Sequence, residues 1–409
     1  MRLLTTIGFL LTALLLTSTF AFGETWEDKL KVGAEVRGRV EIHETDFNSD
    51  TESFNFSLLR TRLNLEFEND ENVGAFVQIQ DSRVFGEMGL SSGGTAEDEN
   101  LGLHQAYAWI KDPYIEGVYA KFGRFEFVRG NQRIFGSVGW SNVGRSFDGA
   151  VAGWDNGNVD IHGFLFNIQE RYIMSNDDYM LGGVYTEIED PGIDLFFAWD
   201  RDGIRNSNDD MRLSRFTTGL YREGKFSDFD YNSNLAYQFG TTIFDSLDIQ
   251  AYLVTLEIGY MLDPEYNARI ALGADITSGD DDASDDKFKA FDNLYYTGHK
   301  FRGYMDYFVS QPEYGLNDIY GKGQFKIQNG PMLSLAAHIF SSNVDYVSMV
   351  DGEDARSIGL EFDASASHQL YENFKWEIGA SAFMPSEDYA GEDSDPAFWL
   401  YLQTTVSLP

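Results

Sequence analysis

Residues 31–42 read KVGAEVRGRVEI, a sequence in which two kinds of side chain alternate. Every even position from Val32 to Ile42 is apolar or glycine, whereas five of the six odd positions carry a charge. Successive side chains of a β-strand point to opposite faces, so a strand here has one apolar face and one charged face. The pattern predicts a strand with hydrocarbon on one side and water on the other.

The same alternation recurs in segments of about ten residues, separated by turns rich in Asp, Asn, Gly and Pro. We count eighteen such segments from Lys31 onward, joined alternately by short links such as 371–374 and by long ones such as 84–101 and 278–320. An even number of strands allows a closed antiparallel sheet, in which every backbone amide within lipid finds a partner. The sequence predicts an all-β transmembrane barrel with long extracellular loops, short periplasmic turns and a water-filled lumen. A secreted soluble all-β protein is the alternative.

The first 23 residues read as a signal peptide. Arg2 precedes an apolar stretch from Leu3 to Phe20, and the small residues Ala21 and Gly23 stand just before Glu24. Residues 24–409 are then expected to form one barrel domain in the outer membrane of a Gram-negative bacterium, in contact with its lipid and lipopolysaccharide. Aromatic residues near strand ends, such as Tyr260 and Trp399, are expected at the membrane surfaces.

Composition excludes several classes of protein. The 409 residues include 66 acidic and 30 basic ones, a net charge of -36, which argues against a nucleic-acid partner. With no cysteine, the chain has no thiolate metal site, thiol nucleophile or disulfide. The six histidines are scattered, and Ser141 misses a nucleophile-elbow motif by one residue. We therefore expect no enzyme and no cofactor, with a barrel hydrolase and a purely structural or adhesive barrel as the lesser alternatives.

Arginines stand out on the predicted inward faces of the first two strands, at Arg37, Arg39, Arg60 and Arg62. In one interpretation these guanidinium groups line the lumen and bind anionic solutes weakly enough to release them. In the other they pair with neighbouring carboxylates across the strands and stiffen the wall. Spacing alone leaves both interpretations open.

The acidic stretch 280–286, DDDASDD, has two interpretations as well. Its carboxylates suit Ca²⁺, a hard cation that prefers oxygen ligands. The stretch lacks the glycine and terminal glutamate of a helix-loop-helix calcium loop, which favours a solvated surface loop.

Two parts of the chain resemble the outer-membrane alginate export family. The first runs from Gly123-Arg124-Phe125 through 131–136 to Arg145-Ser146-Phe147-Asp148-Gly149, and the second runs from Gly273 to His299. The resemblance implies an eighteen-stranded monomeric barrel that passes a polyuronate outward through a narrow basic zone. It assigns Arg124, Arg133 and Arg145 to that zone. The chain departs from the family in two places, because Phe125 replaces an expected glutamine and the turn at 371–374 is too short for a gating plug.

Strand parity complicates one of these assignments. If Phe122 faces lipid, strict alternation points Arg124 toward lipid as well, unless a bulge at Gly123 resets the face or the strand has reached the rim. From these observations we expect a channel for passive passage of hydrophilic, anionic solutes, narrowed by the long loop 278–320. Dedicated export of an anionic polysaccharide such as alginate is the alternative.

Overall fold

The computed structural model describes residues 29–69, 72–85, 99–170, 178–203, 213–242 and 247–408. The expected signal peptide, residues 1–23, lies outside the described residues. No helix in the described ranges is long and apolar enough to cross a membrane.

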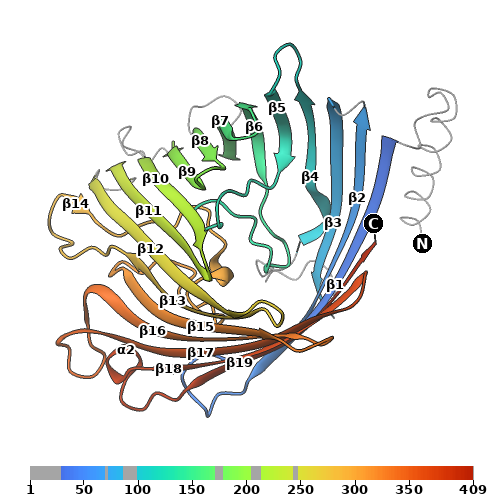
Figure 1. The fold of residues 1–409 in the computed structure, drawn as a ribbon. Coiled ribbons are helices and arrows are strands. Elements are labelled where there is room, and N and C mark those ends of the chain that lie inside the picture. The colour runs from blue at the N-terminus through green and yellow to red at the C-terminus, as the bar shows by residue number, and fades with distance from the viewer. Residues whose placement is uncertain are drawn as a thin grey trace.

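The chain folds into one closed antiparallel sheet (Figure 1). Its strands are β1 (Leu30–Glu44), β2 (Phe54–Asn69), β3 (Val73–Val84), β4 (Glu99–Lys111), β5 (Val118–Phe125), β6 (Phe147–Asp155), β7 (Val159–Gln169), β8 (Tyr179–Ile188), β9 (Ile193–Asp202), β10 (Leu213–Phe226), β11 (Phe229–Thr241), β12 (Asp248–Asp263), β13 (Ala268–Thr277), β14 (Lys287–Phe288), β15 (Leu316–Lys326), β16 (Met332–Val347), β17 (Asp354–Tyr371), β18 (Phe374–Pro385) and β19 (Ala397–Leu408). The short helices are η2 (Gly298–Lys300) and α2 (Glu387–Ala390).

The sheet closes where the two ends of the barrel meet. β1 pairs with β2 on one side and with β19 on the other, where Ala34 lies opposite Leu408. The two-residue strand β14 pairs in parallel with β12 and lies between β13 and β15 in sequence, so eighteen of the nineteen strands form the wall. A closed wall leaves no strand edge unpaired, as a sheet in lipid requires. The predicted eighteen-stranded barrel is confirmed.

The alternation seen in the sequence sorts side chains between the two faces of the wall. In β1, Val32, Val36 and Ile42 are exposed on the outer surface, whereas Arg37 and Arg39 are buried inside. Each neighbouring strand keeps this parity because the pairing is in register: Arg37 lies opposite Arg60, and Val36 lies opposite Thr61. The outer surface is therefore mainly apolar, and charge is concentrated in the interior.

The connections alternate in length as predicted. Short turns, such as 156–158 and 372–373, lie at the end of the barrel where β1 begins and β19 ends, and the long connections lie at the opposite end. Two long connections fold into the barrel: residues 126–146 after β5, here called inner loop 1, and residues 278–315 after β13, here called inner loop 2. Figure 1 shows inner loop 1 as a teal trace within the ring. Inner loop 2 ends before residue 320, the expected bound, because 316–320 already belong to β15.

Much of the interior is packed with side chains of the inner loops, which leaves less open space than the eighteen-stranded wall alone would enclose. Phe127 and Phe135 of inner loop 1 and Phe291 of inner loop 2 join a buried apolar cluster on the inner faces of β5 to β12. A second buried cluster lies against β15 to β19 and contains Phe308 and Trp399. Trp399 therefore faces inward, where its Nε1 donates to Glu41 at 3.0 Å, and it is not part of the membrane-surface belt. The length of the loop 278–320 predicts that it narrows the lumen, but alternation does not show how its side chains pack against the wall.

Candidate functional site

The candidate functional site is the barrel interior, which the two inner loops shape. Inner loop 1 follows β5 directly and turns inward with Phe127, whose ring lies 4.9 Å from Phe164 of the wall and 5.4 Å from Phe135 of the same loop. Full burial of a phenylalanine side chain contributes about 1.5–3 kcal/mol. These rings therefore hold the loop against β7 and its neighbours.

The arginines of β1 and β2 hold the opposite side of inner loop 1. Arg37 donates to the carbonyl oxygens of Gly139 at 2.8 Å and Ser141 at 2.9 Å, and Arg39 donates to that of Trp140 at 2.6 Å. Arg60 donates to the Ser141 carbonyl at 3.3 Å. A hydrogen bond from a charged donor contributes about 1.5–3 kcal/mol, so these bonds fix the loop to the wall.

Carboxylates on the same strands balance part of this charge. Arg39 pairs with Glu41 at 2.6 Å, and Arg60 pairs with Glu35 at 2.8 Å. Arg62 donates to Gln80 at 2.6 Å and lies 3.8 Å from Glu126. The exposure of Arg37, Arg39 and Arg60 is 5% or less. The prediction that these three residues line an open lumen is therefore wrong, because inner loop 1 covers them, and Arg62 is bound in the same wall.

Arg133 of inner loop 1 is completely buried and fixes the two inner loops to one wall residue. Its guanidinium group makes two hydrogen bonds to the carboxylate of Asp275 on β13, at 2.7 and 2.9 Å, and a third to Asn293 at 3.1 Å. Arg302 of inner loop 2 donates to the same carboxylate at 3.1 Å. Asp275 thus joins both loops to the barrel, and the prediction that Arg133 lines the channel is wrong.

Trp140 and Arg145 form two further contacts between the inner loops. The ring of Trp140 stacks on His299 of inner loop 2 at 4.0 Å, and the guanidinium group of Arg39 lies 3.8 Å from the same ring. Arg145 donates to the carbonyl of Tyr296 in inner loop 2 at 3.1 Å, and burial lowers its pKa. Arg145 therefore binds one loop to the other, which differs from its predicted role in the channel lining.

Arg124 faces outward, as strand parity indicated, so its assignment to the lumen is wrong. It shares the outer face of β5 with the exposed Phe122, whereas its neighbour Phe125 is buried inside. Its Nε donates to Asp148 of β6 at 2.7 Å, and Asp148 is likewise on the outer face. The pair stands at the long-loop end of β5, so the strand has reached the rim and no bulge resets its face.

Cavities lined by charged residues remain between the inner loops and the wall in the described part of the chain. Cavity A, of about 390 Å³, is bordered by Lys121, Glu126 and Arg129. Cavity B, of about 560 Å³, shares Arg129 but is otherwise acidic, with lining residues that include Asp160, Glu187, Asp194 and Glu223. Cavity C, of about 160 Å³, is bordered by Arg269, Lys300, Lys322 and a single carboxylate, Asp363.

Cavity C holds two lysines that each have few hydrogen-bond partners. Lys300 donates to the carbonyl of Asn131 at 2.9 Å and lies 5.8 Å from the ring centre of Phe301. Lys322 lies 3.4 Å from Glu257 and 4.3 Å from the ring centre of Tyr320. Each three-donor ammonium group therefore has one hydrogen-bond partner within the described residues. Burial, and then the positive charge of Lys322, lowers the pKa of Lys300. Arg269, by contrast, is paired with both Asp230 and Glu257. An anion entering cavity C would relieve the repulsion between the two lysines.

Lys121, Lys300 and Lys322 are not among the site residues predicted from the sequence, although strand parity points two of them inward. Lys121 and Lys322 have the inward parity of their strands, beside Phe125 and Tyr320 respectively. The Lys121 ammonium group lies 4.1 Å from the ring centres of both Tyr107 and Phe125. Lys300 lies in inner loop 2, where no periodic pattern shows which way a side chain points.

The acidic stretch 280–286 makes contacts of its own. Lys289 binds Asp281 and lies 3.3 Å from Asp285, and Asp282 accepts from Ser284 at 2.6 Å. Within the described ranges, no group of three or more acidic or histidine side chains is arranged to hold a metal ion. Calcium binding at this loop stays a prediction.

The histidines take part in structural contacts. The Nε2 atom of His104 forms a hydrogen bond of 2.9 Å with the carboxylate of Glu126. The hydroxyl of Ser146 lies 3.4 Å from the same nitrogen. A hydrolytic triad instead places the acid and the hydroxyl on opposite nitrogens of the ring. Ser141 uses its hydroxyl oxygen to accept from the backbone of Val143 at 3.2 Å, which shapes the loop.

Comparison with known proteins places this geometry among transport barrels. A family model described as "Alginate export" matches residues 28–395, and a search of curated proteins found no match. OccK2 (OpdF) of Pseudomonas aeruginosa, solved in complex with glucuronate, is similar with a TM-score of 0.61 at 11% identity, over 93% of this chain and 96% of that chain. OccAB4 of Acinetobacter baumannii has a TM-score of 0.62 at 9% identity, over 93% and 98%. A BenF-like porin from Pseudomonas fluorescens Pf-5 has a TM-score of 0.60 at 12% identity, also over 93% and 98%. At these identities the likeness concerns the barrel fold.

Proposed function

The chain belongs to the alginate export family, and from this premise we propose that it is an outer-membrane channel for the passive diffusion of hydrophilic, anionic solutes. The family and the porin-like fold serve transport, which favours a channel over an enzyme. The channel differs from the one expected from the sequence, because lysines take the place of arginines as the solute-facing cations.

The observation that carries this proposal is the charge imbalance in cavity C. Lys300 and Lys322 share a small polar space with one carboxylate, and both keep unused N–H donors. A lysine binds a carboxylate as a point charge and without the two-pronged geometry of arginine. Such contacts attract an anion and also release it, as conduction requires.

The carboxylates of cavity B make one side of the interior negatively charged, whereas the lysines of cavity C make another side positively charged. Asp160, Glu187 and Asp194 border cavity B, and Arg129 separates it from cavity A. An anion is repelled on that side and attracted toward Lys300, which reaches inner loop 1 through the Asn131 carbonyl. The arrangement favours solutes that carry their charge at one end, such as single uronates or other small carboxylic acids.

Export of an anionic polysaccharide is the second candidate, and the family match favours it. The structure of OccK2 with glucuronate shows that a barrel of similar fold binds a uronate. One observation disfavours export of a polymer. The inner loops divide the interior into cavities of about 160 to 560 Å³, and the buried Arg133 holds both loops in place. Single sugar acids therefore fit the interior better than a continuous chain.

The test is the reversal potential of the purified protein in planar bilayers under a salt gradient. We expect anion preference in the wild type and a loss of it in Lys300→Gln/Lys322→Gln. One unit charge at 4 Å in water contributes about 1 kcal/mol, so each lysine should change the permeability of a monovalent anion about five-fold and that of a monovalent cation about five-fold in the opposite sense.

Arg222→Gln is the matched control, because Arg222 is a cation on the outer face of β10 and donates to Tyr231. This variant should leave the permeability ratio unchanged. If the double lysine variant also keeps the wild-type ratio, cavity C does not select anions. If the wild type carries no current, the protein is not a channel of this kind.

A further inference from the structure

The outer face of the wall is indented along β15. Side chains of Ile319 and Phe325 face outward there, but the two positions between them with the same parity are Gly321 and Gly323. A Cβ atom added at Gly323 would meet nothing within 4 Å, and one added at Gly321 would approach only Leu272 at 3.5 Å and the Ala271 carbonyl at 3.9 Å. The backbone of β15 is therefore bare on this side.

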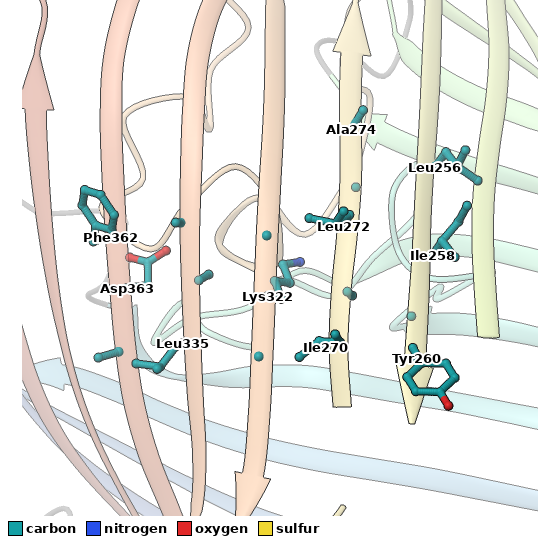
Figure 2. Close-up of a pocket in the computed structure, with 18 of the residues that line it drawn as sticks. Leu256, Ile258, Tyr260, Ile270, Leu272, Ala274, Lys322, Leu335, Phe362 and Asp363 are labelled. Carbon is teal, nitrogen blue, oxygen red and sulfur yellow. The ribbon is translucent and has the colours of Figure 1, made fainter. Parts of the chain in front are cut away.

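Neighbouring strands form the two sides of the indentation. Ile270 and Leu272 of β13 stand on one side, and Leu335 of β16 and Phe362 of β17 stand on the other (Figure 2). Leu272 is 75% exposed and Leu335 is 64% exposed. Strands in a sheet lie about 4.8 Å apart, so the groove between β13 and β16 is about 10 Å wide. Its volume is about 1070 Å³.

The surface of this groove is hydrocarbon and glycine backbone. The two charged residues that border it, Lys322 and Asp363, turn their charged groups inward, toward Glu257 and Ser381 respectively. The groove therefore offers no charged side chain for a polar ligand, and it continues the apolar band that faces lipid acyl chains.

Aromatic residues fix the depth of the groove in the membrane. Phe325 pairs with Tyr266 at 5.7 Å between ring centres, and Phe229 pairs with Tyr260 at 4.8 Å, all at the short-turn end of the barrel. Such rings mark the membrane surface. A strand rises about 3.3 Å per residue, so Gly323 and Gly321 stand about 7 and 13 Å along the strand from Phe325. The hydrocarbon core is about 30 Å thick, which places the groove in the periplasmic leaflet.

We infer that this groove binds one acyl chain of a phospholipid from the periplasmic leaflet of the outer membrane. A linear chain can lie along the strand direction on the bare backbone of β15, between Leu272 and Leu335. A second barrel is a poorer occupant, since a stable interface buries about 800 Å² on each partner and this groove is a narrow strip of the wall. Lipid A is a poorer occupant as well, because it belongs to the opposite leaflet.

Gly321→Val/Gly323→Val tests the inference by filling the groove. Neither glycine needs a positive φ, and valine favours strands, so the barrel should fold. Gly38→Val is the matched control: Gly38 is also an outward glycine of the wall, and its added Cβ would meet only Thr404 at 3.6 Å. Each protein is incubated in mild detergent with phosphatidylethanolamine and lipid A together, and the retained lipids are counted by native mass spectrometry.

The wild type and Gly38→Val should retain one phosphatidylethanolamine, and the groove-filled variant should retain none beyond background. Equal retention in all three proteins, or none in the wild type, would overturn the inference. Preferential retention of lipid A would overturn the choice of leaflet. If the wild type is a dimer and the groove-filled variant is a monomer, a second copy of the chain is the occupant. Circular dichroism establishes that each variant is folded. Conductance is independent of this result, so the channel proposal stands or falls separately.

Discussion

Asp275→Asn should release both inner loops from the wall. The substitution keeps the shape of the side chain but removes the negative charge that Arg133 and Arg302 share. Arg133 and Arg302 are 0% and 2% exposed, so their charges cannot turn to water without moving the loops. Removing one partner of a buried ion pair costs about 3–5 kcal/mol.

The magnitude translates into an observable change of conductance. At 1.4 kcal/mol per factor of ten, about 3–5 kcal/mol raises the ratio of displaced to seated loops about 100- to 4000-fold. We expect single-channel records of Asp275→Asn to show frequent steps to a wider, noisier level that is rare in the wild type. Combining Asp275→Asn with Arg133→Met should add less than the sum of the two effects, because both changes act on one pair.

Asp345→Asn is the control for this prediction. Asp345 pairs with Arg356, but both side chains are about half exposed, and such pairs contribute about 0–1 kcal/mol. Its records should match those of the wild type. If Asp275→Asn also conducts like the wild type, with the same noise and step size, the idea that this carboxylate holds the loops is wrong.

The remaining predictions concern the other contacts of the interior. Arg37→Met removes three hydrogen bonds to inner loop 1 and should increase the conductance. The anion-to-cation permeability ratio should stay unchanged, since the loop covers Arg37, and a changed ratio in reversal-potential measurements would return Arg37 to the channel lining. Asp194→Asn removes one charge from cavity B and should increase the anion preference, and a shift toward cations would contradict the two-sided interior. The pKa of Lys300 is lowered, so this lysine loses its charge at a lower pH than an ordinary lysine does. Anion preference should therefore begin to fall at a pH that is still below the pKa of an ordinary lysine. Lys300→Gln should reduce this pH dependence.

The barrel itself could be predicted from the sequence because alternation is a local property. In residues 31–42 the polarity of each side chain indicates whether it faces lipid or the interior. The pairing of β1 with β2 and β19 keeps the inward and outward positions of the three strands aligned. The outward position of Arg124 follows from the same rule, as does the inward position of Lys121.

The roles of the arginines could not be predicted, because their partners are distant in sequence. The carbonyls that Arg37 binds belong to Gly139 and Ser141, 102 and 104 residues further along the chain. Arg133 is separated by 142 residues from Asp275. An arginine on an inward face looks the same in the sequence whether it meets a solute or the backbone of a buried loop.

Block by a uronate is the most direct test of whether this barrel conducts small anions past its inner loops. Purified protein in a planar bilayer should give discrete single-channel steps, and added glucuronate should interrupt them with a frequency that rises with its concentration and falls in Lys300→Gln/Lys322→Gln. Steps that glucuronate leaves unaffected, or interruptions that persist unchanged in the double variant, would contradict this conduction of small anions.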